Sequence, residues 1–194
     1  LAGDLDGAVA ALDAQVAAAA GTEAEWWTRS VLLVACELEM FAGHPGAAAA
    51  RLTHIGVDHR DRNASLTERA VLARAQASLG DRRTSATLAS LNERLPRTSE
   101  AWVDATLGLA SLATASDPRR ARTLADQAVD AAVTAERTVV ALEARLGRAD
   151  VLADLRQVDD AAAERRAVAG EADELGLGLL AQRAHAGRSA DPDG

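Results

Sequence analysis

The chain contains no lysine and no tyrosine, and it has only one cysteine, one phenylalanine and one isoleucine among 194 residues. Its 48 alanines and 25 leucines favour helix, whereas β-branched and aromatic residues are too few to build the core of a sheet. The hydrophobic fraction of 48% is nevertheless high enough for a packed core rather than disorder. The composition therefore predicts an all-helical fold.

Several kinds of chemistry are excluded by what is missing. Without lysine there is no P-loop lysine for nucleotide phosphates, and neither G-x-G-x-x-G nor G-x-S-x-G occurs. A single cysteine, Cys36, allows no internal disulfide and no CxxC motif. No stretch approaches the roughly 18 apolar residues of a membrane span, and Leu1 to Asp4 do not resemble a signal peptide. We therefore expect a cytoplasmic protein without catalytic activity or cofactor.

The charge of the chain bears on its partners. With 29 acidic and 21 basic residues, the net charge of −8 repels nucleic acid and anionic lipid. Three arginine pairs, which begin at Arg82, Arg119 and Arg165, are surrounded by carboxylates and lack interleaved aromatic residues. These pairs are interpreted as solvated faces or ion pairs between helices. The sequence predicts neither nucleic acid nor membrane as a partner.

One segment contains residue types that could bind a metal ion. His54, Asp58, His59 and Asp61 lie close together, and imidazoles with carboxylates can hold a divalent cation. Their spacing matches none of the compact metal motifs, and Gly56 falls where a helix should stop. A polar loop between helices is the favoured interpretation, and no metal site is predicted.

Short breakers rich in glycine, proline and aspartate divide the chain into ten expected helices. Their approximate ranges are 4–20, 23–42, 46–55, 64–79, 82–95, 99–114, 118–135, 138–155, 159–174 and 177–186. In alternate helices a small residue recurs about seven positions before the breaker, at Cys36, Ala73, Ala110 and Ala149, with separations of 37, 37 and 39 residues. Small side chains are needed where two helices approach closely, so this spacing predicts one helix-turn-helix unit that is repeated along the chain.

The repeated unit resembles the tetratricopeptide repeat (TPR). The match is carried by Leu72-Ala73 and Leu79-Gly80-Asp81 in the third unit, and by Leu1-x-Gly3-Asp4 and Ala8 in the first. The period of about 36–40 residues exceeds the usual 34, and the aromatic positions hold other residues, as in the long degenerate repeats of bacterial signalling proteins. Arginine in place of lysine is typical of a GC-rich, for example actinobacterial, genome. Armadillo-like or HEAT-like helix pairs, and a plain bundle, remain alternatives.

The resemblance implies a right-handed α-solenoid over residues 1–186, followed by a polar disordered tail at 187–194. In such a solenoid the first helix of each pair lines a concave channel and the second helix forms the outer wall. The candidates for binding in this channel are Glu37, Arg74, Asp104, Ser111, Glu143 and Asp150. The Arg165-Arg166 pair is expected on the outer wall, away from a partner in the channel.

Two functions fit such a channel. The favoured one is a non-catalytic interaction module, the sensor or relay part of a larger regulator, which binds a peptide or helix from another protein. The alternative is a small-molecule-sensing solenoid of an inducer-responsive transcriptional regulator. An apolar pocket with convergent polar groups would favour the small molecule, whereas an open, elongated groove would favour a peptide.

Two further expectations concern packing at particular places. Trp26 and Trp27 point about 100° apart on a helix, so one is expected in the core and the other at an edge, while Trp102 is expected in the core. Because residues 1–4 read as the end of a helix and its turn, we expect a fragment of a longer array. The apolar face of the helix at 4–20 would then be open to fraying or self-association.

Overall fold

The computed structural model describes residues 4–19, 27–54, 56–60 and 65–186, and contains no strand within these ranges. The predicted all-helical fold is confirmed. The α-helices are α1 (Leu5–Ala19), α2 (Thr28–Phe41), α3 (Pro45–His54), α4 (Leu66–Ser78), α5 (Ser85–Arg94), α6 (Glu100–Ala113), α7 (Pro118–Thr134), α8 (Thr138–Asp154), α9 (Val158–Glu174) and α10 (Gly178–Ala186). The helix expected at 82–95 is split into a 3-10 turn, η2 (Arg82–Thr84), and α5.

Helix starts follow from side chains that cap free backbone N–H groups. Ser65 and Glu68 form a reciprocal capping box at the start of α4, and Glu68 also accepts a 2.9 Å hydrogen bond from Arg29 of α2. Asp117 caps α7 and is followed by Pro118, whose fixed φ suits the first helical position. These local signals place the helix boundaries close to where the sequence predicts them.

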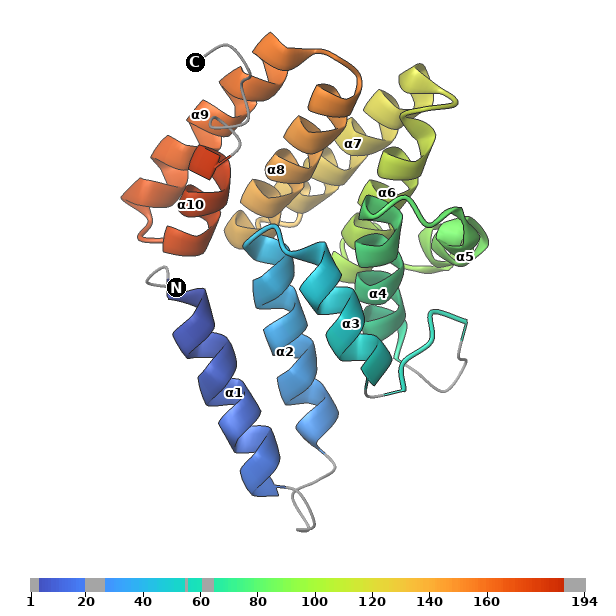
Figure 1. The fold of residues 1–194 in the computed structure, drawn as a ribbon. Coiled ribbons are helices and arrows are strands. Elements are labelled where there is room, and N and C mark those ends of the chain that lie inside the picture. The colour runs from blue at the N-terminus through green and yellow to red at the C-terminus, as the bar shows by residue number, and fades with distance from the viewer. Residues whose placement is uncertain (1–3, 20–26, 55, 61–64, 187–194) are drawn as a thin grey trace.

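Each helix packs against the next one along the chain, and a second set of contacts joins alternate helices (Figure 1). Within this second set, α2 contacts α4, α4 contacts α6, α6 contacts α8, and α8 contacts α10. The set closes on itself, because α10 also contacts α2. Figure 1 shows the red helix α10 beside the blue N-terminal part of the chain. We call these five helices, α2, α4, α6, α8 and α10, the inner helices.

The repeated small residues lie where the helices cross. Cys36, Ala73, Ala110 and Ala149 are all completely buried, as expected. Burial raises the pKa of the Cys36 thiol to about 12, so Cys36 behaves as a small apolar residue. Gly108 marks an especially close approach, because a Cβ there would lie 3.0 Å from Leu88 and 3.3 Å from the Cα of Arg74.

The apolar core is divided into clusters between neighbouring helices. One cluster joins Leu72 of α4 to Leu52 of α3, and another joins Leu146 of α8 to Leu180 of α10. Phe41, at the end of α2, packs against this second cluster from a distant part of the sequence. The core therefore runs between successive helices and is closed by α2 meeting α8 and α10.

Other sequence predictions have mixed outcomes. Trp102 is buried as expected, and its Nε1 donates a 2.9 Å hydrogen bond to the backbone oxygen of Asn92. Trp27 is partly buried, whereas Trp26 and residues 187–194 lie outside the described residues. On α1, which packs against α2, Val9, Leu12 and Val16 are partly buried, and self-association through this face stays a prediction.

Candidate functional site on the inner face

The six candidate residues all come from the inner helices. Glu37 lies on α2, Arg74 on α4, Asp104 and Ser111 on α6, and Glu143 and Asp150 on α8. They are separated by up to 113 residues in sequence but converge on the inside of the helix arrangement, where they line two neighbouring cavities. The residue after each small residue in α2, α4, α6 and α8 therefore lines one of these two cavities.

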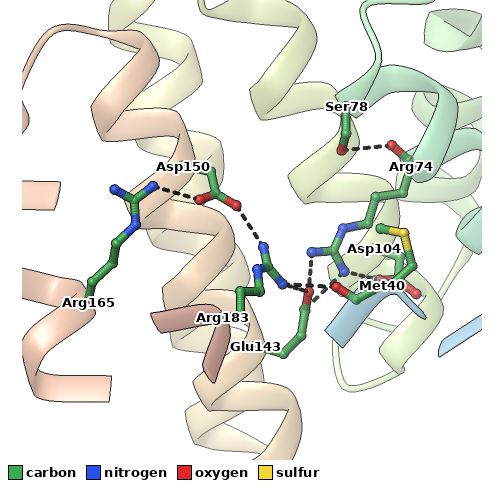
Figure 2. A network of polar contacts seen from close by, with 8 residues as sticks. All are labelled: Met40, Arg74, Ser78, Asp104, Glu143, Asp150, Arg165 and Arg183. Atoms are coloured by element: carbon green, nitrogen blue, oxygen red, sulfur yellow. Dashed lines mark hydrogen bonds and ion pairs between the residues drawn. The ribbon is translucent and has the colours of Figure 1, made fainter. Parts of the chain in front are cut away.

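Arg74 is the centre of the polar network (Figure 2). Its Nη1 donates to Asp104 at 2.5 Å and to Glu143 at 2.9 Å, and its Nη2 donates to the second oxygen of Glu143. Gly147 lies close to Leu107 beside this guanidinium, since a Cβ at that position would lie 3.1 Å from the Leu107 side chain. The side chains of Arg74 and Glu143 are almost completely buried. A buried bidentate ion pair thus joins α4 to α8.

The electrostatics of this cluster set the charge of each carboxyl group. Burial acts to raise the pKa of Glu143, but Arg74 and Arg183 outweigh burial and lower it, so Glu143 is ionised. Burial also opposes charge on Arg74, yet Glu143 and Asp104 raise the pKa of Arg74 above its usual value. Asp104 differs, because burial and the nearby Glu143 outweigh Arg74 and raise its pKa to about 6.

Arg183 of α10 is a member of the network that the sequence did not single out. Its Nη1 donates to the backbone oxygen of Met40 at 3.1 Å and to Glu143 at 3.3 Å, while its Nη2 donates to Asp150 at 2.6 Å. One side chain therefore links α10 to both α2 and α8, as Figure 2 shows. These contacts hold α10 at the place where the inner helices close on themselves.

Arg165 requires a correction. It was expected on the outer wall, but from α9 it reaches the inner face, where its Nη2 donates to Asp150 at 2.9 Å. The expectation was wrong because the long arginine side chain extends past the helix backbone on which it sits. Its neighbour Arg166 is exposed, as expected.

The larger cavity is lined by Arg74 and has a volume of about 480 Å³. Met40, Leu107 and Leu146 supply apolar wall, and Ser78 and Ser111 supply hydroxyl groups. Its charged lining residues are Arg74, Arg165, Arg183, Asp150 and Asp154. The cavity therefore combines apolar surface with polar groups that converge from several helices.

The smaller cavity, of about 220 Å³, is lined by both members of the Arg74–Glu143 ion pair. Glu37, Glu100, Asp104 and Glu143 line it together with apolar residues of α2, α4 and α8. Burial, followed by the charges of Asp104 and Glu100, raises the pKa of Glu37 to about 7. Glu37 therefore gains or loses its charge near neutral pH.

The raised pKa of Glu37 predicts that stability falls as pH rises. Between its unfolded pKa of about 4.3 and its folded pKa of about 7, the folded chain binds more protons than the unfolded chain, which favours folding at the acidic end. Glu37→Gln removes this titration. We expect the variant to be more stable than the wild type by about 1–2 kcal/mol at pH 8, with a difference near zero at pH 4.5.

Urea unfolding at both pH values measures the difference. Glu174→Gln is the matched control, because Glu174 is exposed at the end of α9 and forms no hydrogen bond or ion pair with the residues that the structure describes. A gain at pH 8 that is equal in both variants would show that overall net charge, and not the surroundings of Glu37, is responsible.

The described part of the loop that follows α3 packs against α5. His59 is buried, and its Nδ1 lies 2.9 Å from Thr87 Oγ1 of α5. Burial lowers the pKa of His59, which favours the neutral imidazole. Asp61 lies outside the described residues. In the parts of the chain that are described, no three His, Cys, Asp or Glu side chains are grouped so that they could hold a metal ion.

Comparison of the chain with protein-family models, with curated protein sequences and with solved structures found no match. None of the described helices combines the length and the apolar character needed to cross a lipid bilayer. The contacts and cavities of the inner face are therefore the basis on which a function is proposed.

Proposed function

We propose that this chain is a non-catalytic, TPR-like module that binds a small molecule in the larger cavity of its inner face, as the sensing part of a cytoplasmic regulator. The observation that carries the proposal is the cavity itself. Its volume of about 480 Å³ falls within the range of small-molecule sites, and its walls combine apolar side chains with a few convergent polar groups. No nucleic acid, membrane or cofactor is part of the proposal.

The assignment to TPR-like repeats is supported by how the helices pack. Successive helices contact one another in order, alternate helices contact on the inside, and the repeated small residue is completely buried in four of the inner helices. Packing of this kind is characteristic of repeat arrays, in which each unit mainly touches its neighbours. A right-handed α-solenoid is the arrangement we propose.

The same contacts favour a compact ligand over an extended peptide or a helix. A peptide needs an open groove along the inner helices, with charged side chains free to pair with it. Arg74, Asp104 and Glu143 already pair with one another, and α10 packs against α2 across the channel. The arrangement leaves a short cavity in place of a long groove, which is why the sensing alternative is preferred.

Ligand binding could reach the rest of a regulator through α10. The larger cavity is lined by residues of α4, α6 and α8 together with Arg183 of α10. A ligand that contacts these helices together favours the state in which α10 stays packed against α2 and α8. The signal in this proposal is the change in the population of that closed state, and its size is set by the difference in ligand affinity between the two states.

A cavity-filling variant tests the proposal. Ser111→Trp places an indole in the wall of the larger cavity, and Thr123→Trp on the exposed face of α7 is the matched control. In thermal unfolding with a panel of small acids, amines, alcohols and sugars, we expect at least one class to stabilise the wild type and the control by several degrees, because a ligand bound only to the folded state raises Tm. Ser111→Trp should lose this response. Stabilisation of all three proteins alike, or of none, would contradict a ligand site in this cavity.

A further inference from the structure

Asp150 occupies an unusual place at the larger cavity. One of its carboxylate oxygens accepts from Arg165 of α9 at 2.9 Å and the other accepts from Arg183 of α10 at 2.6 Å, as Figure 2 shows. The two guanidinium groups are mostly buried, with side chains 16% and 14% exposed, whereas the side chain of Asp150 is 52% exposed. Two mostly buried guanidinium groups are therefore bridged by one carboxylate that is about half exposed to solvent.

The two arginines have donors to spare. Among the described residues, Arg165 donates a hydrogen bond to Asp150 alone, which leaves most of its five N–H donors available. Arg183 donates through its two terminal nitrogens, and its Nε–H has no partner among the described hydrogen bonds. A planar guanidinium can donate two parallel hydrogen bonds to one carboxylate. Both arginines can therefore bind a second carboxylate, or exchange Asp150 for another one.

The cavity lining contains a second carboxyl group, that of Asp154. Burial and then the charge of Asp150 raise the pKa of Asp154, and the positive charge of Arg165 acts against them. The charged lining consists of three guanidinium groups against these two carboxyl groups. An incoming anion therefore meets Arg165 and Arg183 rather than Arg74, which already pairs with Asp104 and Glu143.

The cavity lining also includes apolar side chains. Leu107 and Leu146 are almost fully buried and line the cavity, together with Met40 and Val151. An aliphatic chain gains about 0.8 kcal/mol for each CH₂ group that it buries against such side chains. A ligand with a charged head and an aliphatic body meets both kinds of lining residue.

We propose that the larger cavity binds a small aliphatic carboxylic acid, whose carboxylate replaces Asp150 as the partner of Arg165 and Arg183. The ligand carboxylate takes the place of one already present, so the number of charges paired in the site does not change. Asp150 turns into the water that it already faces, which limits the cost of its release. This inference rests on the proposed function and adds the class of the ligand.

Three six-carbon probes with different head groups test the class of ligand. Isothermal titration calorimetry of the full chain compares sodium hexanoate, hexan-1-ol and hexylamine at pH 7.5. We expect hexanoate to bind at least tenfold more tightly than either of the others, because the guanidinium groups attract only the carboxylate. Hexylamine or hexanol binding as tightly as hexanoate would overturn the inference.

Variants locate the binding to the arginine pair. Arg165→Gln should weaken hexanoate binding at least tenfold, and its neighbour Arg166→Gln, which makes the same change of charge on the exposed face, should leave binding within twofold of the wild type. Asp150→Asn removes the internal competitor and should tighten binding by about threefold or more. Arg165→Gln is preferred to Arg183→Gln, because Arg183 also holds α10 to Met40 and Glu143. Circular dichroism checks that each variant is folded.

The outcomes separate this inference from the function on which it rests. Equal losses in Arg165→Gln and Arg166→Gln would mean that general charge attracts the acid, and weaker binding in Asp150→Asn would mean that Asp150 supports the ligand; either result overturns the exchange. If hexylamine or hexanol binds the wild type but not Ser111→Trp, the cavity is a ligand site for another class, and only the carboxylate inference falls. If neither these probes nor the wider panel bind, both fall.

Discussion

Replacing Arg74 with methionine is expected to lower the free energy of unfolding by about 3–5 kcal/mol. Methionine fills a similar volume but leaves the carboxylate of Glu143 buried without its bidentate partner, and Arg183, at 3.3 Å, compensates it only in part. Asp104 loses its ion-pair partner in the same step. The loss is large because removing one member of a buried pair leaves the desolvation cost of the other uncompensated. Urea unfolding at pH 7.5 measures it.

A second substitution shows whether the loss comes from charge or from packing. The double variant Arg74→Met/Glu143→Gln carries no unpaired charge at position 143, so we expect it to be more stable than Arg74→Met alone by about 1–3 kcal/mol. Arg183 keeps a hydrogen-bond acceptor in the amide of the new glutamine. If the double variant were less stable than Arg74→Met, the aliphatic part of Arg74 and its packing against α6 would account for the loss. The buried ion pair would then not be what joins α4 to α8.

The inward-facing residues could be predicted because they depend on local geometry. A small residue marks the point where two helices cross, and the next residue along the helix points to the inside, which is why Arg74, Ser111 and Asp150 all reach the larger cavity. The same rule placed Glu37 beside the smaller one. The spacing of the small alanine and cysteine residues thus indicates which residues line the cavities.

The closure of the inner helices could not be predicted in this way. Arg183 and the backbone oxygen of Met40 lie 143 residues apart, and their meeting depends on how all the intervening helices pack. The sequence does contain one signal that α10 belongs to the inner helices. Ala184 lies 35 residues after Ala149 and is completely buried, so it continues the series of small residues into α10. That series indicates that α10 is a fifth inner helix, although it does not indicate which helix α10 meets.

The difference between Arg165 and Arg166 has a similar origin. Both arginines were expected on the outer wall, because both lie on α9, the second helix of an expected helix pair. Neighbouring residues on a helix point about 100° apart, so one arginine can turn toward α8 and Asp150 while the other faces water. Arg165 and Arg166 were thus expected on the same surface. The side-chain direction of each residue decides which one belongs to the cavity.

Enlarging the buried small residues is expected to destabilise the fold by about 1–3 kcal/mol at each position. Ala73 packs in a cluster with Leu88 and Leu91 of α5, and Ala110 packs in a cluster with Ala125 of α7 and Val151 of α8. Both alanines are completely buried, so leucine at either position has to push two helices apart. Ala86→Leu, on the exposed face of α5, is the matched control and should change stability by less than about 0.5 kcal/mol.

Urea unfolding of Ala73→Leu, Ala110→Leu and the control gives the three free energies on one scale. The two core variants also differ in where the strain arises. Ala73→Leu should disturb the contact of α4 with α5 and α6, next to Arg74, whereas Ala110→Leu should act mainly on α6, α7 and α8. Because α6 takes part in both contacts, and Gly108 of α6 lies close to the backbone of Arg74, we expect the losses in the double variant to depart from additivity by more than about 0.5 kcal/mol. Leucine tolerated at both positions would mean that these residues do not mark the helix crossings, and the inward direction assigned to Arg74 and Ser111 would lose its physical basis.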